Sequence, residues 1–165
     1  MTKALSRRLK QPRFSSAQQE ALLSVVVAAG TINDLMDVVC ERHGLTRSQY
    51  NVLRILRGVY PEGHPRCEIA QRMVERAPDV TRLVDRLQAQ GLVRRSRGSN
   101  DQRQAITRIT AKGLKLLESI HPEVEANGIS LLGKLSDTEC HELSRLSSLI
   151  FDNPELHPTT DAQQQ

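Results

Sequence analysis

The chain has 165 residues, a formal net charge of +4, three cysteines and only 2% aromatic residues. This length predicts one domain rather than two, and the lack of an uninterrupted apolar run of about 18 residues predicts no membrane partner. The first residues, MTKALSRRLKQPRF, lack the apolar core of a signal peptide, so we expect a cytosolic protein.

Charge is distributed unevenly along the chain. Residues 1–65 carry 9 basic and 5 acidic side chains, residues 66–112 carry 11 and 5, and residues 113–165 carry 3 and 9. Positive charge is therefore highest in the middle of the chain, and the last segment is acidic. A basic region of this kind indicates an anionic partner.

The N-terminal part divides into a basic arm at residues 1–14 and a helix within residues 15–45. The arm has no acidic residue, and its basic side chains are Lys3, Arg7, Arg8, Lys10 and Arg13. Such a charge run is either solvated or contacts DNA or a partner subunit. From Ser15 to Glu41 apolar residues recur at helical spacing, which predicts one long helix.

Residues 46–112 combine short helices with a hairpin. Thr46 and Gln49 have the spacing of a capping box, which predicts a helix that starts at Thr46. Glycine and proline residues from Gly58 to Pro65 predict a loop, and apolar periodicity returns from Arg66 to Val74.

The helix expected from Pro78 to Gln90 has two distinct faces. Its apolar side chains recur at i, i+3, i+4 and i+7, and they are Val80, Leu83, Val84 and Leu87. Arg82 and Arg86 fall on the opposite face. Pro78 suits the first helical turn, and Gly91 suits the C-terminal cap. The helix is therefore expected to pack one face and to present arginines on the other.

A β-hairpin is expected directly after this helix. The strands are predicted at Leu92–Arg97 and Ile106–Thr110, and the turn at Gly98–Asp101. Its basic residues are Arg94, Arg95, Arg97, Arg103 and Arg108, and Asp101 is its one acid. Helix, turn, helix and hairpin is the order of a winged helix-turn-helix. The excess of positive charge on the hairpin favours duplex DNA as the partner.

Residues 113–152 are expected to form further helices, the last of which begins at the capping box of Ser136 and Glu139. Together with the helix in residues 15–45, they carry more apolar side chains than a small winged helix can bury. A second copy of the chain would cover them, so the sequence predicts a homodimer. The tail, residues 153–165, is expected to be disordered.

The expected fold is therefore mostly α with a small β-hairpin wing, a winged helix-turn-helix flanked by N- and C-terminal dimerisation helices. The DNA-binding region is placed at residues 46–112, between dimerisation helices at residues 15–45 and 113–152.

The runs LVDRLQAQGLVRR and SNDQRQAITRITAKG resemble the recognition helix and wing of the MarR (multiple antibiotic resistance regulator) family of bacterial transcription regulators. Asp101 and Arg103 stand where the wing tip of that family carries Asp-x-Arg. The resemblance is strongest from Cys67 to Leu117. It implies a cytoplasmic homodimer, nucleoid-associated when bound, that reads a pseudo-palindrome with half-sites about 10 bp apart. It also implies a repressor that a small ligand releases.

Five residues of the predicted recognition helix are candidate DNA contacts, namely Pro78, Asp79, Thr81, Arg82 and Arg86. Arg82 is the candidate base reader, since a bidentate arginine–guanine contact gives about 1–3 kcal/mol of discrimination. Asp79 either accepts a hydrogen bond from cytosine or complements the helix dipole. Pro78 and Thr81 are expected near a thymine methyl group or a phosphate.

Five wing residues are also candidates, namely Arg94, Arg95, Arg97, Asp101 and Arg103. Arg103 is expected to enter a minor groove, and Asp101 either orients its guanidinium or closes the turn. Arg94, Arg95 and Arg97 are expected to contact phosphates, which affects affinity but not the choice of sequence.

The sequence does not identify an effector. Members of the MarR family commonly bind small, often phenolic, ligands in a cleft between the dimer helices and the DNA-binding region, so a small-molecule effector is an expected partner. Cys40, Cys67 and Cys140 form no C-x-x-C pair, and burial is expected for all three. Cys40, Glu41 and His43 do not share one helical face, so we expect no metal site and no cofactor.

The sequence contains few features of other functional classes. No nucleophile elbow, phosphate-binding glycine loop or dinucleotide fingerprint is present, so catalysis is not expected. The few aromatic residues lie outside the basic region, which argues against single-stranded nucleic acids. The alternatives are a sequence-indifferent architectural DNA binder, a winged helix that binds proteins, and a cysteine redox sensor of the same fold.

Overall fold

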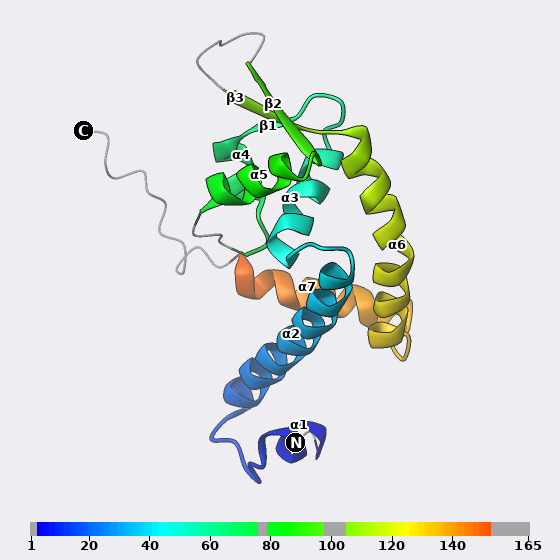
Figure 1. The fold of residues 1–165 in the computed structure, drawn as a ribbon. Helices are drawn as coiled ribbons and strands as arrows, with labels where there is room; N and C mark the ends of the chain where they lie inside the picture. The colour runs from blue at the N-terminus through cyan, green and yellow to red at the C-terminus, as the bar shows by residue number, and fades with distance from the viewer. Residues whose placement is uncertain (1–2, 76–78, 98–104, 153–165) are drawn as a thin grey trace, which may run out of the picture. The chain divides into compact units, whose positions relative to one another are not determined.

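The structure is a computed structural model that describes residues 3–75, 79–97 and 105–152. It contains two compact units, Met1–Glu125 and Ala126–Gln165, which are described separately. In chain order the elements are α1 (Lys3–Leu9), α2 (Ala17–Arg42), α3 (Arg47–Arg57), β1 (His64–Pro65), α4 (Arg66–Arg72), α5 (Val80–Ala89), β2 (Val93–Arg97), β3 (Ala105–Ile109), α6 (Ala111–Leu132) and α7 (Asp137–Phe151) (Figure 1).

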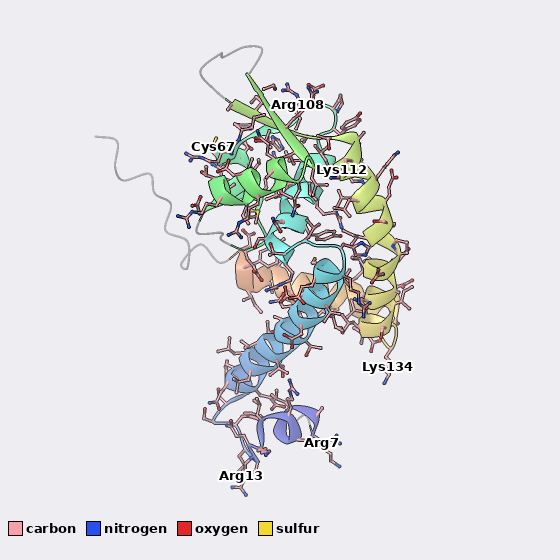
Figure 2. All side chains as sticks on the ribbon, in the orientation of Figure 1. Arg7, Arg13, Cys67, Arg108, Lys112 and Lys134 are labelled. Atoms are coloured by element: carbon pink, nitrogen blue, oxygen red, sulfur yellow. The ribbon has the colours of Figure 1, made fainter. Side chains whose placement is uncertain are left out.

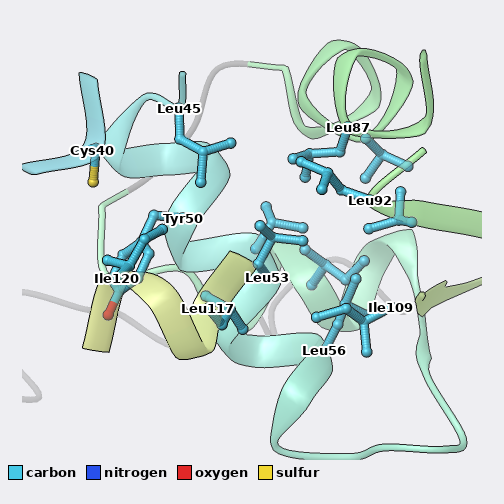
Figure 3. Close-up of a cluster of buried hydrophobic side chains, with 14 of the residues drawn as sticks. Cys40, Leu45, Tyr50, Leu53, Leu56, Leu87, Leu92, Ile109, Leu117 and Ile120 are labelled. Atoms are coloured by element: carbon cyan, nitrogen blue, oxygen red, sulfur yellow. The ribbon is translucent and has the colours of Figure 1, made fainter. Parts of the chain in front are cut away.

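Helix α3 is the central element of the first unit. Its Val52, Leu53 and Leu56 are fully buried. They belong to a core that also takes in Leu87 from α5 and Ile109 from β3 (Figure 3). The core therefore joins the expected recognition helix and hairpin to α3, as a winged helix-turn-helix requires.

The predicted hairpin is confirmed to within a residue at each end. Strands β2 and β3 pair antiparallel, with Arg94 opposite Arg108 and Arg95 opposite Thr107. A third strand, β1, pairs with the other edge of β3, in a stretch that the sequence predicted to be only loop. Gly63 allows the loop before β1 to approach the backbone of β3 closely. Its φ is +90°, and a Cβ there would overlap the carbonyl oxygen of Thr107.

Two helix starts follow the predicted capping boxes. The side chain of Thr46 accepts from the Gln49 backbone N–H, and the Gln49 side chain accepts from the Thr46 N–H. Ser136 and Glu139 make the same reciprocal pair before α7. These local sequence signals therefore set the first turns of α3 and α7.

The first residues contain a helix where the sequence indicated only a basic arm. Helix α1 carries Arg7 and Arg8 in its last turn, and its Leu5 is buried. The charge run therefore includes one buried apolar residue.

Helix α2 has the length and overall apolar composition of a membrane span, which the sequence analysis did not predict. It is long and apolar enough, by length and composition alone, to cross a membrane. Its apolar side chains do not form one uninterrupted run, because polar and charged residues such as Asp34 and Asp37 lie among them. One such helix is weak evidence for a span, since core helices of soluble proteins and signal sequences meet the same criterion.

Within the second unit, α7 exposes its apolar side chains. Leu143, Leu146, Leu149 and Ile150 are all exposed. The helix has no buried residue in the chain taken alone. An apolar surface of this kind is typical of an interaction site. The expected tail, residues 153–165, lies outside the described residues.

Candidate nucleic-acid interface

Asp79 fixes the start of α5 and holds Arg82 at the same time. Its Oδ1 accepts from the backbone N–H of Arg82 at 3.0 Å, which makes it the N-cap. Its Oδ2 lies 3.0 Å from the Arg82 Nε, yet the Arg82 side chain is 80% exposed. The helix therefore begins at Val80, not at Pro78 as predicted, because the cap is Asp79. Pro78 itself lies outside the described residues.

The two faces of α5 are separated as the periodicity predicted. Val80, Val84 and Leu87 are buried in the core. Arg82 and Arg86 are exposed on the other face, and no acidic partner of Arg86 is found within the described part of the chain. Asp79 acts as the side-chain cap of this helix, which is consistent with the predicted complement to the helix dipole; its contact with cytosine stays a prediction.

Thr81 is held by a residue that the sequence analysis missed. Nη1 of Arg66 donates to the Thr81 hydroxyl oxygen at 2.9 Å. Arg66 is exposed at the first position of α4, so it adds a cation beside the recognition helix. The only hint in the sequence is that Arg66 is basic, because its contact with Thr81 depends on the packing of α4 on α5.

The arginines of the hairpin differ in their surroundings. Arg95 pairs with Asp85 of α5 at 2.7 Å, and its side chain is 35% exposed. Arg94 points to the opposite face of the hairpin, because side chains alternate along a strand. It is exposed and lies opposite Arg108, which donates to Ser96. Arg95 thus connects the wing to the recognition helix, while Arg94 faces solvent.

The remaining wing candidates are only partly described. Arg97 ends β2, and its side chain is not described. Asp101 and Arg103 lie outside the described residues.

A hollow of about 410 Å³ separates α4, α5 and the hairpin. We call it the reader–wing hollow; its lining includes Arg66, Cys67, Thr81, Arg95 and Thr107. Two of these residues are arginines, of which Arg95 is paired with Asp85.

A second cavity, of about 220 Å³, lies where α2, α3 and the segment after α4 meet. Its lining includes Ile32 and Met36 of α2, Arg47 and Asn51 of α3, and Val74. We call it the junction cavity. Apolar walls with a few polar groups are typical of small-molecule sites.

Polar contacts at this cavity link three parts of the unit. The Nε of Arg47 lies 2.7 Å from Asp37 of α2, and its Nη1 lies 2.9 Å from Glu75. The Asn51 side chain accepts from the Val74 backbone N–H at 2.9 Å. Val74 and Glu75 precede α5 in the chain, so α2, α3 and the approach to the recognition helix share these contacts.

The cysteines are not all buried as expected. Cys40 is fully buried, Cys140 is half-buried, and Cys67 is exposed on α4 (Figure 2). Burial, with Asp37 nearby, raises the pKa of the Cys40 thiol to about 11 against a smaller lowering by Arg47. The expectation of burial was wrong for Cys67, because the helix periodicity there turns it outward, and it was met only in part by Cys140.

His43 and its neighbours make contacts other than metal ligation. Its Nε2 lies 2.9 Å from Glu123 of α6, and Arg42 lies 3.1 Å from the same carboxylate. Hydrogen bonds from His43 and then Arg42 hold the pKa of Glu123 below its usual range. Among the described residues, no group of three histidine, cysteine or acidic side chains is arranged to hold a metal.

Comparisons with known proteins agree with this geometry. A family model described as the MarR family matches residues 45–105. The HTH-type transcriptional regulator MhqR of Bacillus subtilis (strain 168) is 31% identical over 110 residues, which are 66% of this chain and 74% of that protein. The chain belongs to the MarR family. The resemblance seen in the recognition helix and wing is confirmed.

Solved MarR structures share the fold. A MarR transcription factor from Planctomyces limnophilus is 39% identical, with a TM-score of 0.63 over 83% of this chain and 99% of that chain. Sco3205, a MarR family regulator from Streptomyces coelicolor solved in complex with DNA, is 22% identical. Its TM-score is 0.75 over 90% of this chain and 93% of that chain. At this identity, the likeness shows a shared fold and not a shared function. MarR proteins are transcription regulators with a winged-helix DNA-binding fold and are not enzymes.

Proposed function

We propose that this MarR protein is a repressor that binds a pseudo-palindromic operator as a homodimer. The observation that carries the proposal is Arg82, which extends into solvent from the first turn of α5. A recognition helix places its N-terminal residues against base edges in the major groove. Arg82 has the reach and the donors for guanine there, and Asp79 keeps it at the helix start.

The surrounding residues suit contacts to phosphates and the minor groove. Arg86 and Arg94 are exposed, and Arg66 adds a cation beside Thr81. Among the described arginines of α5 and the hairpin, Arg82 and Arg95 each make an ion pair, and Arg95 is the less exposed of the two. We therefore assign Arg95 to positioning the wing. Arg103, with Asp101, remains our candidate for the minor groove.

Exposed apolar side chains support a dimer. Those on α2 are Leu22, Val25, Val26, Ile32 and Val38, and those toward the C-terminus are Ile129, Leu132, Leu135, Leu143, Leu146, Leu149, Ile150 and Phe151. A symmetric second copy would bury both sets, and two recognition helices could then meet half-sites about 10 bp apart. The same burial would account for the apolar character of α2 in a cytoplasmic, DNA-bound protein.

The junction cavity is the proposed effector site. A small phenolic ligand there would contact Arg47 and Asn51, which hold the segment leading to α5. Disturbing these contacts would shift the recognition helix and release the operator. Adding a panel of small phenols to the protein–operator complex tests this, and retention of DNA with every compound would argue against it.

The experiment that tests the proposed function is a selection from random duplex DNA at near-physiological salt, since phosphate attraction dominates binding at low salt. We expect a two-fold symmetric motif with half-sites about one turn apart. Recovery of no motif would overturn sequence-specific regulation and point to an architectural or protein-binding winged helix.

A further inference from the structure

A third hollow, of about 320 Å³, lies between α3 and α6. Its lining is Tyr50, Arg54, Arg57, Gly58, Leu117 and His121. It shares only Tyr50 with the junction cavity and no residue with the reader–wing hollow. We call it the α3–α6 hollow. All of its residues belong to the first unit.

Arg54 is held in place at the edge of this hollow. Its Nη1 donates to the Tyr50 hydroxyl oxygen at 3.0 Å, and its guanidinium carbon lies 5.8 Å from the centre of the Tyr50 ring. Tyr50 is itself buried and lies beside Leu117 and Ile120 of α6 (Figure 3). Two contacts with a buried ring reduce the freedom of the guanidinium, and the hydrogen bond uses only one of its five N–H groups.

Arg54 and Arg57 make no ion pair in the part of the chain that the structure describes. Within residues 3–75, 79–97 and 105–152, no carboxylate lies within ion-pair distance of Arg54 or Arg57. By contrast, Arg42 at the end of α2 and Arg47 at the start of α3 both pair with acids. Near the hollow, Glu125 lies 4.0 Å from the His121 Nε2, at the limit of an ion pair.

We propose that the α3–α6 hollow binds the phosphoryl group of a small organic phosphate. Two arginines offer planar pairs of donors that match phosphate oxygens, and His121 adds a third nitrogen group. The volume is at the lower end of small-molecule sites. Leu117 is the one aliphatic side chain of the lining, so the hollow favours a polar oxyanion over the aromatic ligand proposed for the junction cavity.

Occupancy of the hollow would connect two elements with different functions. Arg54 and Arg57 belong to α3, at the centre of the DNA-binding region, and His121 belongs to α6, which leads toward the C-terminal helices. A bound phosphoryl group would therefore stabilise the packing of α3 on α6. The inference goes beyond the proposed function, because it requires neither an operator nor the phenolic effector.

The test is calorimetric titration of the full chain, without DNA, with sodium pyrophosphate. We expect saturable binding that weakens by about tenfold or more in an Arg54→Gln, Arg57→Gln double variant, since charge-assisted hydrogen bonds are lost. The matched control is Arg7→Gln with Arg13→Gln, which removes the same charge from exposed residues outside the hollow. Tyr50→Phe, which removes only the hydroxyl that holds Arg54, should also weaken binding.

Each outcome decides the proposal. Undetectable binding by the wild type, or equal binding by the hollow and control variants, would overturn it. If the hollow variants lose pyrophosphate and keep their affinity for duplex DNA, the ligand is a free phosphate. If they lose both in equal measure, the hollow binds the DNA backbone and not a small organic phosphate, which would overturn the proposal.

Discussion

Arg82 and Arg95 have the same side chain and different surroundings. Arg82 pairs with Asp79 within its own helix and is 80% exposed, whereas Arg95 pairs with Asp85 across two elements and is 35% exposed. An exposed ion pair contributes only about 0–1 kcal/mol, so Arg82 can exchange Asp79 for a base at little cost. Arg95 would lose its contact between wing and helix if it did the same.

We therefore expect different effects from removing Arg82 and Arg94. Arg82→Ala should abolish sequence preference, a loss of about 1–3 kcal/mol of discrimination. Arg94→Ala, on the solvent face of the hairpin, should weaken specific and random duplexes equally. Affinities for both kinds of duplex, measured at one salt concentration, check this. Equal losses on both duplexes in both variants would contradict the assignment.

The cysteines should differ strongly in reactivity. Cys40 is fully buried with a pKa raised to about 11, so almost no thiolate forms at neutral pH. Cys67 is exposed on α4. We expect a thiol reagent to modify Cys67 in the folded protein and Cys40 only after unfolding, with mass spectrometry as the readout. Rapid modification of Cys40 in a Cys67→Ser variant would show that the core opens.

At the scale of elements, the contacts around the hairpin and α6 decide how the DNA-binding region holds together. Gly113 lies at the start of α6, and a Cβ there would overlap the Leu92 carbonyl oxygen and the Ile109 side chain. Glu123, further along α6, joins the helix to the end of α2 through His43 and Arg42. Both residues fix how α6 packs against neighbours that are distant in the chain.

Gly113→Ala should destabilise the protein by roughly 1–3 kcal/mol, because the backbone must shift to admit the methyl group. Gly58→Ala is the matched control. Gly58 has a right-handed helical φ of −61°, and a Cβ there meets ordinary contacts. Urea unfolding of the two variants measures the difference. A loss as large for Gly58→Ala as for Gly113→Ala would show that the close approach is not the cause.

The contacts of Glu123 predict a dependence of stability on pH. Its pKa is lowered in the folded chain by hydrogen bonds from His43 and Arg42. A lowered pKa stabilises the fold above the ordinary value near 4.5, and the contribution is lost as the pH falls through the folded value. Glu123→Gln should therefore reduce the loss of melting temperature between about pH 6 and about pH 3.

Glu118→Gln on the same helix provides the comparison, since Glu118 makes no ion pair within the described residues. An equal change of slope in both variants would rule out the specific contribution of Glu123.

At the scale of the whole molecule, the exposed apolar side chains of α2 and α7 require a covering surface. Val26→Asp and Leu146→Asp place a charge on each of these helices, where the side chains are 58% and 47% exposed. Burying an unpaired carboxylate in an interface is costly, so both variants should dissociate to monomers. Val74→Asp, at an 86% exposed position outside these helices, should stay dimeric. Sedimentation equilibrium separates these outcomes, and a wild type that is monomeric would refute the dimer.

Local signals in the sequence predicted most of the elements. Capping boxes marked the starts of α3 and α7, and the alternation of Thr and Ile marked β3. The strand β1 and the contact of Arg66 with Thr81 were missed. Both depend on residues far apart in the chain, and no local pattern encodes such a pairing.

What the sequence by itself determined is the winged-helix order, the separation of α5 into buried and arginine-bearing faces, and membership of the MarR family. The first two follow from helical and strand periodicity, capping and turn residues, which act over a few neighbouring positions. The family was indicated by the resemblance of the α5 and hairpin sequences to MarR proteins and was shown by the comparisons. Only the tertiary structure decided that Asp85 pairs with Arg95, that Arg47 joins α2 to Glu75, and that Arg54 and Arg57 line one hollow together. Such contacts arise where separate elements pack, because packing sets which side chains come within reach of one another.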